Sequence, residues 1–249
     1  MEKKKNYTNL VLIGLAVLAA FLAGSAWTKI RTEGGVSPQQ AASQPSPAVE
    51  AAQTFEAEKA DKPVVKFFVM AFCPYGNQAE EGLKPVYELL KDKVDWQPRY
   101  IVSDGLKEGE WESLHGEQEL NQDVREICAF KMGDLNKWWQ FVSLVNKNCT
   151  YENADICWEK QAQEAKLATS QISTCLNSQK TSLLTAELAE ANKYQAQGSP
   201  TVYINDVLYQ GGRSPEDYKK AICESFTEAP KECETVLGSE SSGAQGGCN

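Results

Sequence analysis

The chain has 249 residues, 42% of them hydrophobic, which is enough for one or two domains. Its 34 acidic residues outnumber its 25 basic residues and give a formal net charge of -9. Basic residues cluster only near the N-terminus, so the sequence is not expected to bind nucleic acid.

The first segment along the chain is an apolar stretch with basic residues on either side. Residues 10–27 carry no charge and follow three lysines at residues 3–5. A helix needs about 20 apolar residues to cross a membrane, and lysines favour the cytoplasmic side. The pattern predicts a cytoplasmic N-terminus at residues 1–9, a transmembrane signal-anchor at 10–27 and an extracytoplasmic remainder. A cleaved signal peptide that releases a secreted domain is the alternative, because residues 24–26 fit a small-residue cleavage site.

Two further stretches have the composition of disordered chain. Residues 28–62 are rich in Pro, Ser, Gln, Ala and Glu, which predicts a flexible linker. Residues 238–249 are rich in Gly and Ser, which predicts a disordered tail, and this tail contains Cys248. The folded domain is therefore expected over residues 63–237.

The folded domain begins with the pattern of a strand, a helix and a second strand. The apolar run at residues 64–72 is typical of a strand buried on both faces. A helix is expected from about residue 74 to 91, with a proline in its first turn. Residues 94–102 predict a second strand, and a right-handed crossover makes the two strands parallel.

Helices and a hairpin make up the rest of the domain. A hairpin is predicted from strands at residues 201–204 and 207–210 that a short turn joins. Ser214, Pro215 and an acid two residues later have the order of a helix start, so a final helix is expected there. The intervening helices are predicted at residues 117–131, 135–147, 154–169, 172–176 and 182–195. Trp138 and Trp139 are interpreted as core residues of one of these helices.

All eight cysteines follow the apolar N-terminal stretch, where an oxidising compartment would allow disulfides. Cys73 is excluded from the structural cysteines because it is a candidate reactive residue, and Cys248 because it lies in the predicted disordered tail. The six that remain are candidates for structural disulfides and permit fifteen pairings. The pairs Cys149–Cys157 and Cys223–Cys233 are favoured because each flanks a short segment that turns back on itself. Cys128–Cys175 is then left by elimination. With one histidine and no Cys-x-x-Cys motif, neither a metal site nor a cofactor is expected.

Two short segments carry a resemblance to a known family. Residues 67–76 read Phe-Phe-Val-Met-Ala-Phe-Cys-Pro-Tyr-Gly, and residues 198–204 read Gly-Ser-Pro-Thr-Val-Tyr-Ile. They resemble the active-site turn and the cis-proline loop of the thioredoxin-fold superfamily. The order of elements, with helices inserted at about residues 103–197, is similar to the DsbA-type variant. The resemblance implies an α/β, thioredoxin-like fold behind the N-terminal transmembrane helix and linker.

A second match lies inside the helical insertion. His115, Gly116, Glu119 and Cys128 have the spacing of a signature in gamma-interferon-inducible lysosomal thiol reductases, although two cysteines of that signature are absent. The segment also resembles the thioredoxin-like part of vacuolar sorting receptors, which implies a binding protein. From its position alone, His115 is expected to cap the helix that begins at Glu117.

Cys73 is the candidate nucleophile. At the start of a helix its thiolate faces unsatisfied N–H groups and the positive end of the helix dipole. Partial exposure would let that thiolate attack a disulfide. Gly76 stands where a dithiol enzyme has its second cysteine, so redox chemistry at the turn would start from one thiol. The residues expected to bind substrate around it are Phe72, Pro74, Tyr75, Ser199 and Pro200.

Two functions are compatible with these features. The first is a membrane-tethered, extracytoplasmic protein that performs thiol-disulfide exchange, as an oxidoreductase or isomerase, on a protein or peptide substrate with a disulfide or thiol. A membrane redox enzyme is a further candidate partner, to which the tether would give a high effective concentration. The alternative is a redox-inactive adaptor that binds extended peptides or a partner protein in the same groove.

Overall fold

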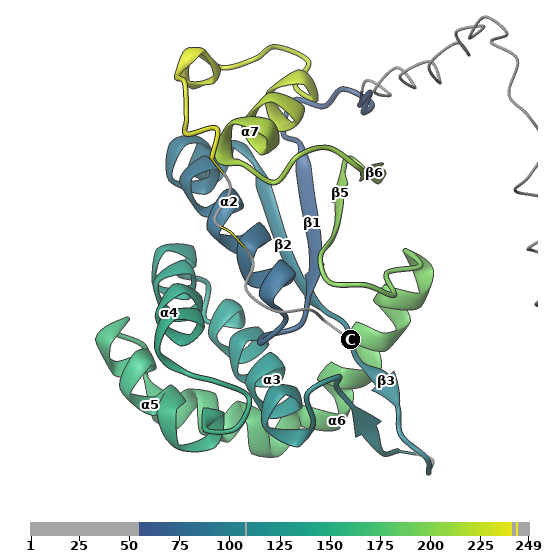
Figure 1. Ribbon diagram of the computed structural model, residues 1–249, viewed down its shortest axis with the longest axis vertical. Helices are drawn as coiled ribbons and strands as arrows, with labels where there is room; N and C mark the ends of the chain where they lie inside the picture. Colours follow the sequence, from purple (N-terminus) through teal and green to yellow (C-terminus); the bar gives the residue numbers. More distant parts are fainter. Residues whose placement is uncertain (1–54, 108, 241–242, 244–249) are drawn as a thin grey trace, which may run out of the picture. The chain divides into compact units, whose positions relative to one another are not determined.

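The computed structural model describes residues 55–107, 109–240 and 243 (Figure 1). The predicted membrane segment, most of the predicted linker and Cys248 lie outside the described residues. In the part of the chain that is described, no helix combines the length and the apolar character that crossing a membrane requires.

A four-stranded sheet in the order β2-β1-β5-β6 forms the centre of the domain. β1 pairs in parallel with β2 and antiparallel with β5, which confirms the predicted strand-helix-strand unit. β6 pairs antiparallel with β5 across Asn205 and Asp206, which both have positive φ, as expected for a two-residue hairpin turn. The strands are β1 (Val64–Val69), β2 (Asp95–Tyr100), β5 (Thr201–Ile204) and β6 (Val207–Tyr209).

The helices follow the predicted order, with two short 3-10 turns in addition. They are α2 (Pro74–Leu90), η1 (Lys91–Lys93), α3 (Glu117–Lys131), α4 (Leu135–Asn148), α5 (Ala154–Glu164), α6 (Thr169–Lys193), α7 (Pro215–Glu224) and η2 (Lys231–Glu234). α7 begins with the capping box of Ser214 and Asp217, as its sequence predicts.

Three elements differ from the prediction. The two helices expected at residues 172–176 and 182–195 form one helix, α6, because no Gly or Pro interrupts the polar stretch between them. α5 ends at Glu164, before residue 169, because the chain turns into the left-handed region at Lys166 (φ 59°). A small hairpin of β3 (Ser103–Asp104) and β4 (Trp111–Glu112) was not predicted, because strands of two residues are too short to show an alternation of apolar and polar residues.

β1 is buried on both faces, as predicted for a central strand. Phe67 points into the larger apolar cluster, where its ring stacks on Trp139 at 5.7 Å between centroids. Trp138 and Trp139 are each about 1% exposed, which confirms them as core residues. Phe68 points to the other face and packs with Ala191 near the C-terminal end of α6. The sheet therefore lies between the helices that carry the main core and the end of α6.

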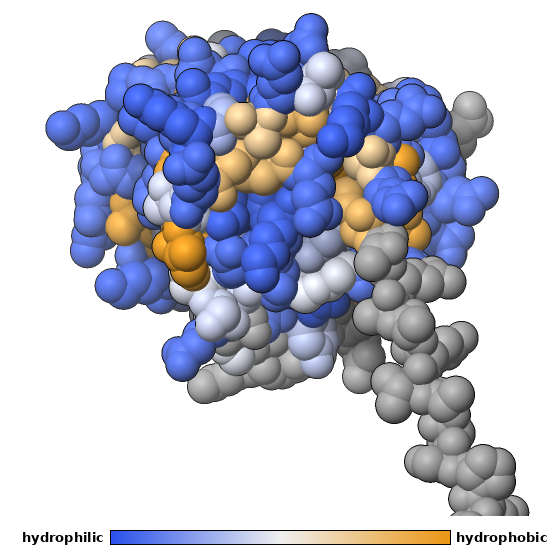
Figure 2. All heavy atoms as spheres, turned by 90° about the horizontal axis from the view of Figure 1, so that it is seen from above, coloured by the Kyte–Doolittle hydropathy of each residue, from blue (hydrophilic) through white to orange (hydrophobic). Residues whose placement is uncertain are grey.

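The folded unit begins earlier than residue 63. Ala60 donates its N–H to the carbonyl oxygen of Ser225 at 2.9 Å, and Phe55 packs edge-on against Tyr209 at 5.3 Å between ring centroids. Residues 55–62, predicted as the end of the linker, thus pack on the domain. Seen from the end that carries α7, the surface has small apolar areas among hydrophilic side chains (Figure 2).

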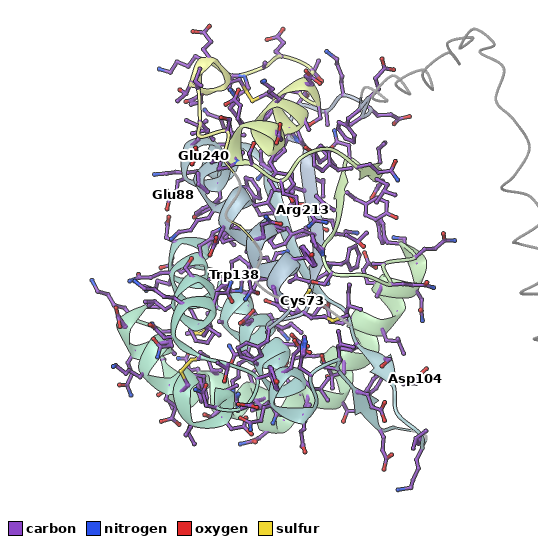
Figure 3. The ribbon with its side chains drawn as sticks, viewed as in Figure 1. Cys73, Glu88, Asp104, Trp138, Arg213 and Glu240 are labelled. Atoms are coloured by element: carbon purple, nitrogen blue, oxygen red, sulfur yellow. A yellow bond between two sulfur atoms is a disulfide. The ribbon has the colours of Figure 1, made fainter. Side chains whose placement is uncertain are left out.

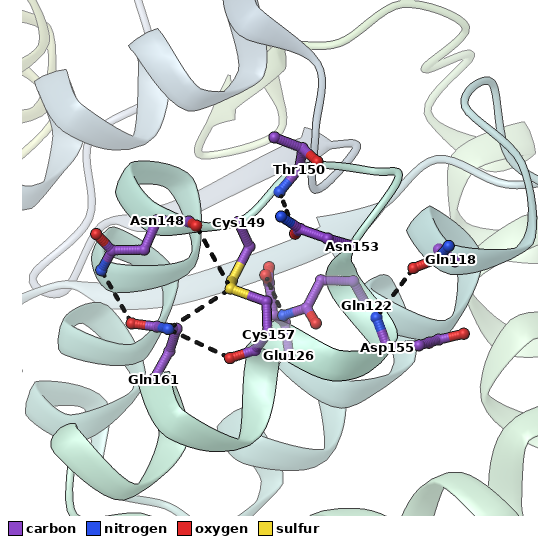
Figure 4. The surroundings of a disulfide bond; sticks show 10 residues. All are labelled: Gln118, Gln122, Glu126, Asn148, Cys149, Thr150, Asn153, Asp155, Cys157 and Gln161. Atoms are coloured by element: carbon purple, nitrogen blue, oxygen red, sulfur yellow. Dashed lines mark hydrogen bonds between the residues drawn. A yellow bond between two sulfur atoms is a disulfide. The ribbon is translucent and has the colours of Figure 1, made fainter.

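Three disulfides join neighbouring elements, and they are the pairs that the sequence favoured. The Cys149–Cys157 bond connects the end of α4 to α5, and the side chains of Asn148 and Gln161 form a 2.9 Å hydrogen bond beside it (Figure 4). The other two bonds connect α3 with α6 and α7 with η2, as Cys128–Cys175 and Cys223–Cys233.

Candidate functional site

Cys73 lies at the junction of β1 and α2 (Figure 3). It is the residue that precedes the first turn of α2, with extended backbone angles (φ -74°, ψ 119°), and Pro74 follows at the first helical position. The N–H of Asn77 donates to the carbonyl oxygen of Cys73 at 2.9 Å, which is the first hydrogen bond of the helix. The sequence thus places this sulfur at the N-terminal end of a helix, as predicted.

The loop before β5 lies against Cys73. The Ser199–Pro200 peptide bond is cis, and the carbonyl oxygen of Ser199 is 3.4 Å from Sγ of Cys73. Oγ of Ser199 accepts a hydrogen bond from the N–H of Met70 at 3.1 Å, which ties the loop to the end of β1. The two segments that the sequence singled out therefore meet, although Cys73 and Ser199 are 126 positions apart.

Gly76 is packed against this loop. A Cβ atom at Gly76 would lie 2.5 Å from Oγ of Ser199 and 3.4 Å from the carbonyl oxygen of Met70. The first distance is far inside van der Waals contact, so any side chain there would displace Ser199. The serine hydroxyl occupies the space that a second thiol in the turn would need.

Cys73 itself is fully buried, so the expected partial exposure is wrong for this form of the protein. Cys73 is also disulfide-bonded. Its partner is none of the other six described cysteines, which pair with one another. No cysteine in the described ranges is a free thiol. The structure thus represents the oxidised form of the site.

The predicted substrate-binding residues surround Cys73 in the chain or through the cis-proline loop. They differ in exposure: Tyr75 is 39% exposed, Phe72 is buried, and the half-buried residues are Pro74, Ser199 and Pro200. Tyr75 is therefore the most exposed of these five residues.

Arg213 adds a charged group to the rim of the site. Its guanidinium lies 5.3 Å from the ring centre of Tyr75 and donates to Oε1 of Gln78 at 3.3 Å. Sequence reasoning did not place Arg213 at the site, because only the packing of α7 on α2 brings the residue before Ser214 next to the first turns of α2.

Two acids of α3 accept hydrogen bonds from the backbone of the turn that leads to Cys73. Glu119 accepts the N–H of Phe72 at 2.9 Å, and Asp123 accepts the N–H of Ala71 at 3.0 Å. Both carboxylates are fully buried, and they lie one helical turn apart on the same face of α3. The helical insertion therefore fixes the conformation of the turn that carries Cys73.

His115 continues this network toward the surface. Its Nδ1 lies 2.8 Å from Oε1 of Glu119, and its ring stacks on Tyr151 at 5.2 Å between centroids. Gly116, with φ 89°, takes the position before the first turn of α3. The expectation that the imidazole caps this helix is wrong, because the side chain turns back to the carboxylate that binds the active-site turn.

Two buried acids of α3, Asp123 and Glu126, have raised pKa values. Burial raises the pKa of Asp123 well above its usual range, and the neighbouring charge of Glu119 acts in the same direction. Burial also raises the pKa of Glu126 to about 7, although Gln122 and the hydroxyl of Tyr100 donate hydrogen bonds to its carboxylate. Burial thus raises the pKa of two acids of α3, and one of them, Asp123, binds the backbone of the turn before Cys73.

Comparisons with known proteins agree with this geometry. The profile of the vacuolar sorting receptor thioredoxin-like domain family matches residues 26–223. No curated protein sequence matches the chain.

Solved structures resemble the described domain at low sequence identity. The reduced form of DsbG from Mycobacterium tuberculosis aligns with a TM-score of 0.51 and 18% identity, covering 68% of this chain and 81% of that chain. Reduced DsbA from the same organism has a TM-score of 0.50 and 18% identity, with coverages of 68% and 85%. Oxidised DsbA has a TM-score of 0.50 and 17% identity, with coverages of 71% and 94%.

Such identities show a shared fold and nothing of its chemistry. The strand order, the cis-proline loop and the inserted helices fit a DsbA-like thioredoxin fold. The family profile covers most of the chain and includes both Cys73 and Pro200. This chain therefore belongs to the vacuolar sorting receptor thioredoxin-like domain family.

Proposed function

We propose that this protein performs thiol-disulfide exchange on protein or peptide substrates through Cys73. The observation that supports the proposal is the position of Sγ, at the N-terminal end of α2 and 3.4 Å from the carbonyl oxygen of Ser199 before a cis-proline. An extended substrate segment beside such a loop can pair with its backbone groups. The sulfur and a substrate cysteine would then lie side by side.

The surroundings of Cys73 favour the thiolate of the reduced form. The N–H groups of Tyr75 and Gly76 belong to the first turn of α2, where helices lack internal acceptors, and no acidic residue lies in that turn. The thiolate attacks one sulfur of a substrate disulfide and forms a mixed disulfide, while the other substrate sulfur leaves as a thiolate. In the reverse direction a substrate thiolate attacks the mixed disulfide, forms a disulfide within the substrate and releases the thiolate of Cys73.

The location of this activity follows from the sequence of the N-terminal segment. We propose that residues 10–27 anchor the chain in a membrane and that the domain lies on the extracytoplasmic side, where three structural disulfides would persist. N-terminal sequencing of the mature protein is the test. A first residue near Trp27 would replace the anchor with a cleaved signal peptide and a secreted domain.

A second candidate function is binding without redox chemistry. The exposure of Tyr75 beside Cys73 favours it, since a ring that is 39% exposed can contact a partner without any reaction at the sulfur. The family is named after sorting receptors, and a receptor acts by binding another molecule. In that case the exposed ring of Tyr75 and the cation of Arg213 would contact the partner.

Alkylation of Cys73 after mild reduction separates the two functions. For an activated thiol, the pH dependence of the rate should have its midpoint well below pH 8.5, the ordinary thiol pKa. Cys73→Ser should abolish mixed-disulfide formation with a disulfide peptide, while the domain still unfolds in one cooperative thermal transition.

The double variant Cys149→Ser/Cys157→Ser is the matched control for this experiment. It removes another cysteine pair at a distance from the turn, so it should retain the mixed disulfide. A Cys73 that reacts only after the protein is unfolded would refute exchange and favour the binding function.

A further inference from the structure

We infer that Arg213 selects substrates that carry an acidic side chain close to the cysteine that reacts with Cys73. The inference rests on the exchange function proposed above and names the class of substrate, which is an extended protein or peptide segment with Asp or Glu beside its cysteine. Arg213 would act by binding the carboxylate of that side chain, and it takes no part in the reaction of the sulfur atoms.

Arg213 lies beside the first two turns of α2, the helix that begins after Cys73 (Figure 3). Its Nη1 donates to Oε1 of Gln78 at 3.3 Å, and its guanidinium carbon lies 5.3 Å from the ring centre of Tyr75. Gln78 is five residues after Cys73, which corresponds to ~7.5 Å along the helix axis. The cation is therefore within reach of a substrate that is bound at the sulfur.

The backbone of Arg213 is fixed on both sides. Its carbonyl oxygen packs so closely against α2 that a Cβ on Gly82 would lie 2.4 Å from it. The next residue, Ser214, forms the capping box of α7 with Asp217. Because this backbone is already ordered, little of its conformational freedom is lost when the side chain binds a ligand.

The guanidinium of Arg213 has one edge that is open to solvent. Among the described residues, only its Nη1 has a hydrogen-bond acceptor, which is Gln78, and neither Nε nor Nη2 is buried. These two nitrogens form an edge that can donate two parallel hydrogen bonds to one carboxylate. The ring of Tyr75, which is 39% exposed, lies next to the same group and can stabilise its charge.

The other two arginines in the described part of the chain are neutralised within the protein. Arg99 forms an ion pair with Glu187, and Arg125 forms one with Asp155. No carboxylate of the described residues forms an ion pair with Arg213. Arg213 thus differs from both in being able to bind a carboxylate that another molecule supplies.

The charges around the site make this cation selective. The chain has a formal net charge of -9, which repels acidic molecules at long range. No acidic residue lies in the first turn of α2. At the start of α7, Glu216 already forms an ion pair with Lys219, and Asp217 belongs to the capping box. Attraction to Arg213 can therefore offset the general repulsion for a carboxylate that is bound beside the reactive cysteine.

An extended substrate can place such a carboxylate at the right distance. Successive residues of an extended chain are ~3.3 Å apart, so the separation of ~7.5 Å corresponds to about two residues. Residues two positions apart also point to the same side of an extended chain. We therefore expect the acidic residue at the second position before or after the substrate cysteine.

Activated peptides measure this preference. Two peptides with blocked ends carry one cysteine in a disulfide with 2-mercaptopyridine, and the second residue on either side of the cysteine is Asp in one peptide and Asn in the other. The thiolate of Cys73 attacks the peptide sulfur, forms a disulfide with it and displaces pyridine-2-thiolate, whose absorbance gives the rate. One disulfide bond forms and one breaks, so no further oxidant takes part.

The full-length protein is mildly reduced before the assay, and the rate of the Cys73→Ser protein is subtracted to remove reactions at other thiols. The Asp peptide should react about five-fold faster than the Asn peptide, the effect of one exposed charge pair. The ratio of the two rates should decrease in ~1 M sodium chloride, because salt screens exposed charges. A ratio near one at low salt, or one that salt does not change, would overturn the inference.

Arg213→Met tests the assignment to this residue. The ratio should fall to one or below, because the net negative charge then acts without the opposing cation. A structural effect of the substitution would slow both peptides and leave the ratio unchanged. Lys220→Met is the matched control, since it removes the same charge from an exposed side chain of α7, and it should retain the preference for the Asp peptide.

The outcomes separate the selectivity from the exchange function. A preference for the Asp peptide that survives in Arg213→Met would overturn the inference while the exchange function stands. If Cys73 reacts with neither peptide in the unchanged protein, the exchange function fails, and the selection by Arg213 fails with it.

Discussion

The contact between Gly76 and Ser199 allows a quantitative test of the packing at the site. Gly76→Ala places a Cβ 2.5 Å from Oγ of Ser199 and forces the serine away from the N–H of Met70. Crowding a packed site costs roughly 1–3 kcal/mol, and a buried N–H without a partner costs a further ~1–3 kcal/mol. A helix gains up to ~1 kcal/mol when alanine replaces glycine, so we expect a net loss of about 2–4 kcal/mol.

A double-mutant cycle distinguishes this overlap from a general effect of substitution. Ser199→Ala alone should cost ~1–2 kcal/mol, because the N–H of Met70 loses its acceptor. The double variant Gly76→Ala/Ser199→Ala should cost no more than Ser199→Ala, since the next nearest atoms to the new Cβ are at 3.4 Å and 3.5 Å. The two substitutions should thus couple favourably by about 2–4 kcal/mol, the full cost of Gly76→Ala alone.

Urea unfolding of the non-reduced protein, followed by tryptophan fluorescence, measures these differences. Gly198→Ala is the matched control, because a Cβ at this neighbouring glycine meets nothing within 4 Å, and it should change stability by less than ~0.5 kcal/mol. If Gly76→Ala is as mild as Gly198→Ala, or if the two costs simply add, the steric argument is refuted.

Three further predictions concern the turn, the buried acids and the disulfides. Gly76→Cys alone should destabilise the protein, whereas Gly76→Cys/Ser199→Ala should give Cys73 a second thiol within the turn, and the resulting dithiol pair is detectable by mass after alkylation. The raised pKa of Glu126 means that its contribution to stability is fully present below the ordinary carboxyl pKa and is lost as pH rises through about 7. Glu126→Gln should therefore stabilise the domain at pH 8. It should also weaken the pH dependence of the urea denaturation midpoint between pH 5 and 8, and an unchanged pH dependence would contradict this. Removing Cys128–Cys175, with a sequence separation of 47, should cost ~4 kcal/mol, against ~2.5 kcal/mol for Cys149–Cys157, with a separation of 8, and equal losses would argue against loop entropy as the cause.

Local signals made much of the fold predictable. The start of α7 is specified by Ser214 and Pro215, and the hairpin turn by Asn205 with its neighbour, so each was found from adjacent residues. The disulfide pairs of short span were predictable for the same reason. The length of α6 was not, because the polar residues between its two apolar stretches resemble a loop until tertiary packing buries the flanking ones.

The residues of the active-site turn and the cis-proline loop were predictable from the sequence, whereas the buried acids that bind the turn were not. The sequence identified Cys73 and Pro200 because their neighbours form recognisable motifs. Glu119 and Asp123 were missed as supports of the turn, since acids on a helix are normally assigned to its solvent face. Their spacing on the same stripe as Leu120 and Val124 was the available signal, because that stripe has to be buried.

The loops that the three described disulfides close do not interleave along the sequence. The Cys149–Cys157 loop lies wholly inside the Cys128–Cys175 loop, and the Cys223–Cys233 loop lies outside both. Because no loop crosses another in the sequence, each bond can close in any order and none has to be opened for another to form. Oxidative folding of this part of the chain therefore needs no obligatory sequence of bond formation, and an isomerase would be required only to correct a misplaced bond.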